Sequence, residues 1–411
     1  MLVVAILAQA ILLTGQFALA AAASAAQHHA RHFPALPISV LDSTNVWAPT
    51  VGGGYTVARY ALAIAQSLVA IAIARSPKLC VGSRSVAAAS ALGFVIAFCA
   101  PVLTSADVYA YIAYGIFATS AYAPAGPLPP SFAAIGDWWS PLPPSVYGAL
   151  WTAVSTLLVA VGHTPFGAVL AFRALGAAAL LLLVRFARGE SWTAALMVAT
   201  SPVLLWLGVG DAHNDLLAVD AALLAVALAR RRPLLAALAI AGAILVKATV
   251  LLPAVLAVRA VRGLRLQFVT AAGGIAVAAI VTWIAGGAAY IRALRADALT
   301  HHTLYGGLHF ALFALAIVLT VLAVRGRMFP GGEWAYPWAA AWLYPWYLHW
   351  ALPYALLRRG AIVQFLCALP LAAVALDTTY QAPFAARSAA VIGALFVLRI
   401  RLRDGSPLDA H

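Results

Sequence analysis

The sequence predicts an all-α membrane protein, and three observations lead to that prediction: its composition, its recurring apolar segments and the placement of its basic residues. Apolar residues fill 64% of the 411 positions and charged residues only 9%, with a mean hydropathy of +0.96. Soluble domains carry about 25% charged residues. A soluble chain this poor in charge is unable to cover its surface, whereas a bilayer removes the need. We expect one transmembrane bundle over residues 1–411.

Apolar segments recur along the whole chain at lengths typical of membrane helices, which need about 20 apolar residues to cross a bilayer. They lie near 1–26, 57–74, 85–104, 166–184, 191–208, 213–229, 234–247, 249–258, 267–285, 308–324, 334–357, 361–376 and 383–398. About 12 to 14 helices are predicted. Lys247 interrupts one apolar stretch and three prolines interrupt 334–357, so both are predicted to be broken. The first segment is too long for a signal-peptide core and is predicted to be retained.

The basic residues divide unequally between the two sides of this bundle. Eighteen of the 25 Lys and Arg residues fall in seven clusters, which share one side when consecutive segments are drawn as hairpins. The positive-inside rule makes that side cytoplasmic. We therefore expect a multi-pass protein of a bacterial-type plasma membrane with both termini in the cytoplasm. The net charge of +13 then reflects sidedness and does not indicate nucleic acid binding.

Three outer segments are expected to carry function: the loop 105–165, the motif 208–215 and the loop 286–307. The first contains no Lys or Arg, eight prolines and many aromatic residues. Its parts 105–119 and 145–162 are apolar enough to lie in the membrane interface as amphipathic helices, a depth that aromatic residues favour. A substrate carried on a lipid is expected to be handled there.

Asp107 is the first candidate for chemistry, because it follows an apolar segment on the outer side. It is expected either to cap the next helix, as Ser105 also can, or to act as a general base, and the two roles are compatible. The segment 208–215 carries four polar side chains where a capping loop needs one, so function is favoured there. Its Asp and His side chains suit a divalent cation such as Mg²⁺ or Mn²⁺, but the pattern specifies no metal and no cofactor is firmly implied.

Positive charge on the same side comes from Lys247, Arg292 and Arg295, which together are expected to clamp a phosphate. The alternative for each arginine is snorkelling to lipid headgroups, which is harder for a lysine inside an apolar segment. His301 and His302 are weaker candidates in the same loop. The three cysteines show no metal-ligand spacing and no disulfide framework.

Several motifs occur in an order that resembles a known family. They are Ser105-Ala-Asp-Val-Tyr-Ala-Tyr-Ile-Ala-Tyr-Gly115, Trp139-Ser-Pro-Leu-Pro-Pro-Ser-Val-Tyr-Gly148, Asp211-Ala-His-Asn-Asp215, Arg230-Arg-Arg-Pro233, Leu245-Val-Lys247 and Tyr344-Pro-Trp-Tyr-Leu-His-Trp-Ala-Leu-Pro353. The ordered set resembles bacterial polyprenyl-phosphomannose-dependent α-mannosyltransferases of the GT-C superfamily. The chain departs from the family pattern at Ala121-Tyr-Ala-Pro-Ala125 and at Ala149, where the family has Asn-Pro-Tyr and a proline.

The resemblance implies a GT-C-like fold, a donor sugar β-linked to a polyprenyl phosphate, a glycan or lipid-linked acceptor and an inverting single displacement. Asp107 would be the general base, with Asp215 beside His213 as its rival and Asp137 as a third choice. The candidate substrate-binding residues are Tyr109, Tyr111, Tyr147, Asp211, Asn214, Lys247, Arg292, Arg295, His301, His302, Trp346 and Tyr347.

Two other classes stay open at this point. A transporter or a flippase for lipid-linked glycans would also place charges in a membrane cavity, but the broken stretch at Lys247 has no clear partner in a second half. A scaffold without activity would tolerate neutralisation of Asp107. The donor sugar is expected to be a hexose, with mannose favoured. Glucose, the pentose arabinose or another sugar stays open as an alternative.

Overall fold

The computed structural model confirms the all-α class: the described residues form 17 α-helices, several short 3-10 helices and one π-helix, with no β-strand among them. The structure describes residues 2–27, 53–76, 81–100, 102, 105, 107–136, 142–302, 306–338 and 343–378. The predicted segment 383–398 lies outside them.

Five helices are long and apolar enough to cross a membrane. They are α1 (Leu2–Gln27), α2 (Gly53–Arg75), α7 (Pro165–Arg188), α12 (Leu264–Ala285) and α17 (Ala361–Thr378). A sixth candidate is a bent pair, α8 (Trp192–Ala199) with the π-helix η4 (Leu204–Gly210). The protein is therefore a multi-pass integral membrane protein, with fewer long spans than the predicted apolar segments because several of those segments are shorter or broken.

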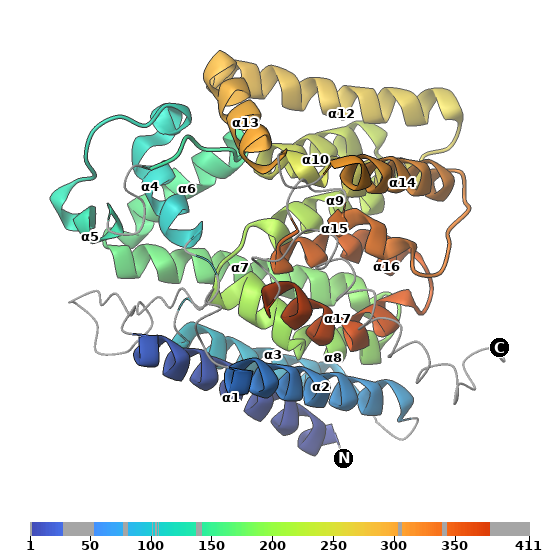
Figure 1. Cartoon of the computed structure of the whole chain (residues 1–411). Coiled ribbons are helices and arrows are strands. Elements are labelled where there is room, and N and C mark those ends of the chain that lie inside the picture. Colours follow the sequence, from blue (N-terminus) through green and yellow to red (C-terminus); the bar gives the residue numbers. More distant parts are fainter. Residues whose placement is uncertain are drawn as a thin grey trace.

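The shorter apolar helices surround these spans. They are α3 (Ser83–Cys99), α6 (Ala149–Gly162), α9 (Asp215–Ala229), α10 (Pro233–Val246) and α14 (Gly306–Val324). Figure 1 shows α1, α2 and α3 along one edge of the molecule and α12 along the opposite edge, with α7 and α9 between them. α12 exposes large apolar side chains such as Phe268, Trp283 and Ile284, as expected for a helix that faces lipid.

The three breaks in the apolar pattern have local causes. At Lys247 the backbone is extended, which ends α10 and is followed by η5 (Ala248–Val250), α11 (Leu251–Val255) and η6 (Leu256–Ala260). This confirms the predicted break. The stretch 191–208, predicted as one segment, bends by 57° between α8 and η4, near Pro202. A proline has no N–H to continue a helix, which accounts for a break there.

The proline-rich stretch near the C-terminal end is also broken, as predicted. Its described parts are η7 (Gly332–Trp334), α15 (Ala335–Trp338), η8 (Pro345–Ala351) and α16 (Leu352–Leu357). Pro345 begins η8, where a missing N–H costs nothing because the first turn has no partner for it.

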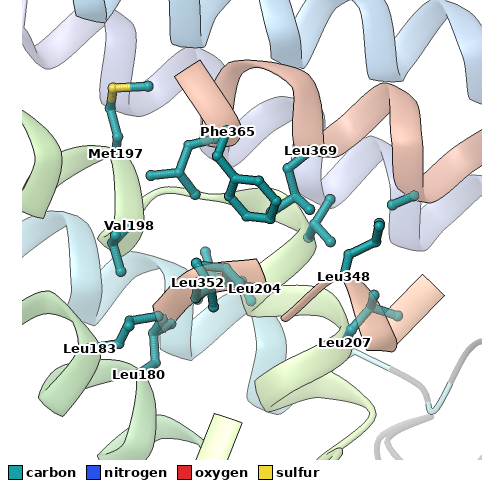
Figure 2. Packing of buried hydrophobic residues seen from close by; sticks show 14 of the residues in the cluster. Leu180, Leu183, Met197, Val198, Leu204, Leu207, Leu348, Leu352, Phe365 and Leu369 are labelled. Carbon is teal, nitrogen blue, oxygen red and sulfur yellow. The ribbon is translucent and has the colours of Figure 1, made fainter. Parts of the chain in front are cut away.

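A large apolar core joins these parts and fixes η4 against η8. Figure 2 shows leucines of α7, η4, η8 and α16, with Met197 and Val198 of α8, packed around Phe365 and Leu369 of α17. Leu204 and Leu207 of η4 and Leu348 of η8 are 1% exposed or less. Because η4 leads directly into the segment 211–215, this core determines where that segment lies relative to η8.

The segment 105–165, for which an outer position stays a prediction, contributes α4 (Asp107–Phe117), η2 (Ala118–Tyr122), η3 (Pro130–Phe132) and α5 (Ala133–Gly136) before α6. Eight successive residues of α4, 108–115, are buried. The prediction of an amphipathic surface helix over 105–119 therefore differs from the structure: α4 packs against α6 and α7 and is enclosed on nearly every side. Three tyrosines on α4 fill that interior instead of facing a membrane interface.

Contacts between loops support the predicted grouping of basic clusters. The backbone N–H of Gly360 donates to Glu190 Oε1 at 2.9 Å, and Arg358 Nη2 lies 3.6 Å from Glu333 Oε1. Arg259 contacts Met328. Clusters that are far apart in sequence thus meet, as they must if they share one side. The cytoplasmic orientation of the termini stays a prediction.

Candidate functional site

Asp107 is the first residue of α4, and its carboxyl group faces other side chains. The capping bond comes from its neighbour: the backbone N–H of Asp107 donates to Ser105 Oγ at 3.1 Å. The Tyr147 hydroxyl donates to Asp107 Oδ2 at 3.2 Å, and His213 Nδ1 lies 3.5 Å from the same oxygen. The Asp107 side chain is 19% exposed, whereas that of His213 is 0% exposed. The carboxyl group is thus held at one oxygen and partly open.

Burial raises the pKa of the Asp107 carboxyl above its ordinary value, while Lys247 and hydrogen bonds from Ser105 and Tyr147 act in the opposite direction. Burial also holds the pKa of His213 well below its usual range, and the charge of Lys247 adds to that effect. His213 is therefore a neutral imidazole at physiological pH. It lies beside Asp107 as an uncharged ring and does not neutralise the charge of the carboxylate.

Asp215, the first residue of α9, has a different environment. Lys247 Nζ donates to both of its carboxylate oxygens, at 2.9 and 3.0 Å, and Trp350 Nε1 donates to Oδ1 at 2.6 Å. The Asp215 side chain is completely buried. The ammonium group of Lys247 also lies 4.7 Å from the ring centre of Tyr347 and 5.6 Å from that of Trp350. Asp215 is therefore engaged by a cation, and aromatic rings exclude water around the pair.

The motif that ends at Gly148 and the motif Leu245-Val-Lys247 come into contact at Gly148. The N–H of Gly148 donates to the carbonyl of Val246 at 3.3 Å, and a Cβ atom on Gly148 would lie 2.2 Å from the Leu245 carbonyl oxygen. Only glycine permits this approach. It brings Tyr147 beside Lys247, whose Nζ lies 5.9 Å from the centre of the tyrosine ring.

The segment 211–215 leaves η4 through a strained residue. Ala212 has a φ angle of 55°, in a region that costs about 1–2 kcal/mol for a residue with a side chain. Arg173 of α7, fully buried, supports the turn: its Nε donates to the Gly210 carbonyl at 2.8 Å and its Nη1 to that of Phe98 at 2.9 Å. Asp211 is fully buried and interacts electrostatically with Arg173. Its charge therefore acts mainly within the scaffold.

The short helix η8 closes the site with aromatic rings. Trp346 stacks on His213, with ring centres 4.1 Å apart and an angle of 17° between the planes. Tyr344 stacks on the Trp346 ring at 4.3 Å, and Tyr347 stacks on Trp350 at 4.1 Å. Each indole ring of η8 thus lies near one of the two aspartates. Trp346 packs on the imidazole beside Asp107, and Trp350 donates a hydrogen bond to Asp215.

The remaining candidates differ in how directly they contact this cluster. Tyr111 packs edge-on against Tyr147, with ring centres 5.0 Å apart, so it lines the same cluster. Tyr109 is buried and interacts electrostatically with Arg173. Asn214 lies next to His213 in the chain, and its side-chain amide is buried.

Arg292 and Arg295 are exposed on α13 (Gly287–His302), and no contact joins either to the Asp107 cluster within the described part of the chain. α13 nevertheless packs close by, because Tyr290 OH reaches the Val146 carbonyl at 3.5 Å. The side chains of His301 and His302, and all of Asp137, lie outside the described residues.

Sequence reasoning missed Trp350 as a partner of Asp215 and gave His349 no role. Trp350 is 135 residues from Asp215 in the chain, so no local pattern indicated their contact. A usable signal was present in the motif itself: a tryptophan inside a broken apolar stretch has an N–H that needs an acceptor. The described residues contain no group of three or more His, Cys, Asp or Glu side chains placed to hold a metal ion.

With this geometry established, comparison with known proteins identifies the family. The MptA/B family, described as "Alpha-(1->6)-mannopyranosyltransferase, N-terminal domain", matches residues 3–263, more than half of the chain. The chain belongs to this α-(1→6)-mannopyranosyltransferase family. No curated protein and no solved structure matches it. The resemblance to polyprenyl-phosphomannose-dependent GT-C mannosyltransferases is confirmed.

Family membership decides between the classes that the sequence left open. The protein is a membrane hexosyltransferase, and the transporter, flippase and scaffold alternatives fall away. Within the matched range the site contains Asp107, Tyr147, His213, Asp215 and Lys247. The departure at Ala149 changes little in the structure of this mannosyltransferase. Ala149 is the first residue of α6, a position where proline is common but other residues also occur.

Proposed function

We propose that the enzyme transfers mannose from a polyprenyl-phosphate donor to a hydroxyl group of a glycan or lipid-linked acceptor, at the outer face of a bacterial-type plasma membrane. One observation carries the proposal. Asp107 is a partly open carboxyl group whose contacting side chains, Tyr147 and His213, are neutral, next to a second carboxylate that is buried and bonded to a cation. Such a group suits a general base.

In the proposed reaction Asp107 accepts the proton of the acceptor hydroxyl as that oxygen attacks C1 of the mannosyl group. The bond between C1 and the phosphate oxygen breaks, the polyprenyl phosphate leaves with the bonding electron pair, and the configuration at C1 inverts. A β-linked donor then yields the α-linkage for which the family is named. A double displacement would need a second free carboxylate as nucleophile, and Asp215 is occupied by Lys247 and Trp350.

Tyr147 and His213 are proposed to orient the base. Both approach Oδ2 of Asp107, which holds the plane of the carboxyl group in one direction. Burial raises the pKa of Asp107, which makes its carboxylate a stronger base than an exposed aspartate. General base catalysis contributes about 10²–10⁴-fold in rate, so the rest must come from positioning and from stabilisation of the leaving phosphate.

Positive charge for the leaving phosphate is proposed to come from Lys247, Arg292 and Arg295. Asp215 uses two of the three N–H donors of the lysine ammonium group, which leaves one for a phosphate oxygen. The two arginines are exposed on α13, which contacts the chain one residue before Tyr147. A guanidinium group suits phosphate because it donates two parallel hydrogen bonds. No glycine-rich nucleotide-binding loop is visible in the sequence, which favours a donor carried on a lipid.

The test is a transfer assay with purified enzyme in nanodiscs, offering radiolabelled mannose as polyprenyl-phosphate mannose or as GDP-mannose, with an α-mannoside acceptor. We expect transfer from the lipid-linked donor alone, and little from polyprenyl-phosphate glucose in a parallel reaction. Transfer from GDP-mannose in the absence of any lipid-linked mannose would overturn the proposed donor.

A further inference from the structure

Beside Asp107 lies a group of buried polar side chains whose hydrogen-bonding atoms have few protein partners. Both ring nitrogens of His349 and both side-chain amide atoms of Asn214 have no hydrogen-bond partner in the described part of the chain. Of His213, only Nδ1 has a polar contact, the one with Asp107 at 3.5 Å. Leaving such a group unpaired in a protein interior costs about 1–3 kcal/mol, so native proteins keep few of them. Several together next to a proposed base indicate a polar ligand.

His349 is the member of this group to which the sequence analysis assigned no role. Its side chain is completely buried in η8, between Leu348, which packs into the apolar core, and Trp350, which bonds to Asp215. An apolar side chain would suit these surroundings. An imidazole at this position instead carries a desolvation cost, because neither ring nitrogen has a described hydrogen-bond partner. Packing alone therefore does not explain the histidine.

The geometry of η8 directs His349 toward the same region as Trp346. A 3-10 helix has three residues per turn, so residues three apart lie one above the other on the same face. Trp346 stacks on His213, which contacts Asp107. His349 is also close enough to His213 and to Lys247 to interact with them electrostatically. The imidazole therefore lies on the side of η8 that faces the proposed base.

We propose that His349, together with Asn214, binds a hydroxyl group of a hexose substrate and so contributes to sugar recognition. Burial lowers the pKa of His349 to about 3, so the ring is neutral and offers one donor and one acceptor. A sugar hydroxyl matches both, since it too donates and accepts. A phosphate group at neutral pH mainly accepts, and a polyprenyl chain does neither. This inference rests on the proposed function, because the hexose is the one that Asp107 acts on.

The experiment compares wild type, His349→Leu and His349→Asn with a complete set of substrates and with single-deoxy analogues. One series varies the mannosyl donor and a second series varies the α-mannoside acceptor, so the two sources of the hydroxyl are distinguished. A site built to bond a hydroxyl discriminates strongly against the analogue that lacks it. We expect wild type to lose at least about 10²-fold in kcat/KM with one analogue in one series. The His349→Leu variant should show a similar loss with the complete substrate and no further loss with that analogue.

His349→Leu should fold, because an apolar side chain replaces an unpaired polar one at a buried position. Its melting temperature should equal or exceed that of wild type, which separates a recognition defect from a folding defect. His349→Asn keeps hydrogen-bonding atoms and should retain part of the discrimination. A matched control is Ser90→Ala in α3, which also removes a buried hydroxyl without a described partner and should leave discrimination unchanged.

The inference would be overturned if His349→Leu kept wild-type kcat/KM and the wild-type pattern across all analogues. His349 would then be a buried residue of the scaffold. Failure of wild type to use polyprenyl-phosphate mannose at all would instead defeat the proposed function, and the two failures are separate because one is measured in wild type and the other in the variant.

Discussion

The starts of α4 and α9 each place an aspartate at the first residue of a helix, and the two carboxyl groups have opposite surroundings. Asp107 contacts a phenol and a neutral imidazole and keeps a 19% exposed side chain. Asp215 is completely buried and receives hydrogen bonds from an ammonium group and an indole. The residue type and the position within the helix are the same for both aspartates. The difference between them therefore comes from the partners that the tertiary structure supplies.

From this contrast we propose that the cluster holds a reactive carboxyl group, Asp107, and a structural one, Asp215. A buried ion pair is costly to break, because either partner left alone is an uncompensated charge. A partly open carboxyl group with neutral partners is free to accept a proton. The proposed roles therefore make different demands: Asp107 is needed for turnover, and Asp215 is needed for a folded site.

The largest expected effect tests the first role. Asp107→Asn retains size and removes the proton acceptor, so we expect kcat to fall by about 10²–10⁴-fold with a melting temperature close to that of wild type. The α4 cap should survive, because the capping oxygen belongs to Ser105. Turnover of the purified variant in nanodiscs, measured together with its thermal melt, checks this. Activity within a few-fold of wild type would remove Asp107 from the reaction.

The second role is tested by Asp215→Asn, which removes the carboxylate charge that is bonded to the buried ammonium group of Lys247. We expect a loss of about 3–5 kcal/mol in stability, seen as a clear fall in melting temperature. The double variant Asp215→Asn with Lys247→Met removes both charges and should recover much of that loss while remaining poorly active. If Asp215→Asn melted like wild type and lost only turnover, the division of roles between the two aspartates would be wrong.

A smaller effect is expected at the exposed arginines of α13. Arg292→Ala and Arg295→Ala should each raise the KM for the lipid-linked donor by about 3- to 10-fold, because solvent screens an exposed contact. If each contact is bidentate, lysine at these positions should bring the KM only part of the way back to the wild-type value. Arg265→Ala, also exposed but at the far end of α12, serves as the control. If all these variants had the same KM as wild type, Arg292 and Arg295 would not contact the donor phosphate.

The smallest effect concerns the departure from the family pattern after Tyr147. Ala149→Pro places proline at the first position of α6, where its fixed φ angle and missing N–H fit a helix start. We expect a gain of up to about 1 kcal/mol in stability and unchanged turnover. A loss of activity in this variant would show that the Tyr147–Gly148 junction tolerates less change than its geometry indicates.

Much of the helical architecture could be predicted because it depends on local pattern. The predicted segment 166–184 corresponds to α7, and the interruption at Lys247 coincides with the end of α10. The bend between α8 and η4 was not predicted, since Pro202 lies inside an apolar run that looks continuous by hydropathy. The burial of α4 was also missed, because a helix rich in tyrosine has the same composition at a membrane interface as in a protein interior.

The sequence predicted which residues belong to the candidate site, but it did not predict which of them contact one another. Motif resemblance brought Asp107, His213, Asp215 and Lys247 to attention, and the structure places them together. Their pairing depends on contacts between distant segments, such as the approach of Gly148 to Leu245, which no local period encodes. Hence Lys247 was expected to clamp a phosphate together with Arg292 and Arg295, and its bond to Asp215 appears only in three dimensions.

The central claim, that the carboxylate of Asp107 is the base, is tested most directly by the pH dependence of kcat. Activity should fall as pH drops through the pKa of Asp107, because protonation removes the acceptor, and burial should place this acidic limb above the ordinary aspartate value of about 3.9. The Tyr147 hydrogen bond lowers that pKa, so its removal in Tyr147→Phe should move the limb to higher pH. An acidic limb that stays in place in Tyr147→Phe, and persists in the residual activity of Asp107→Asn, would contradict the account.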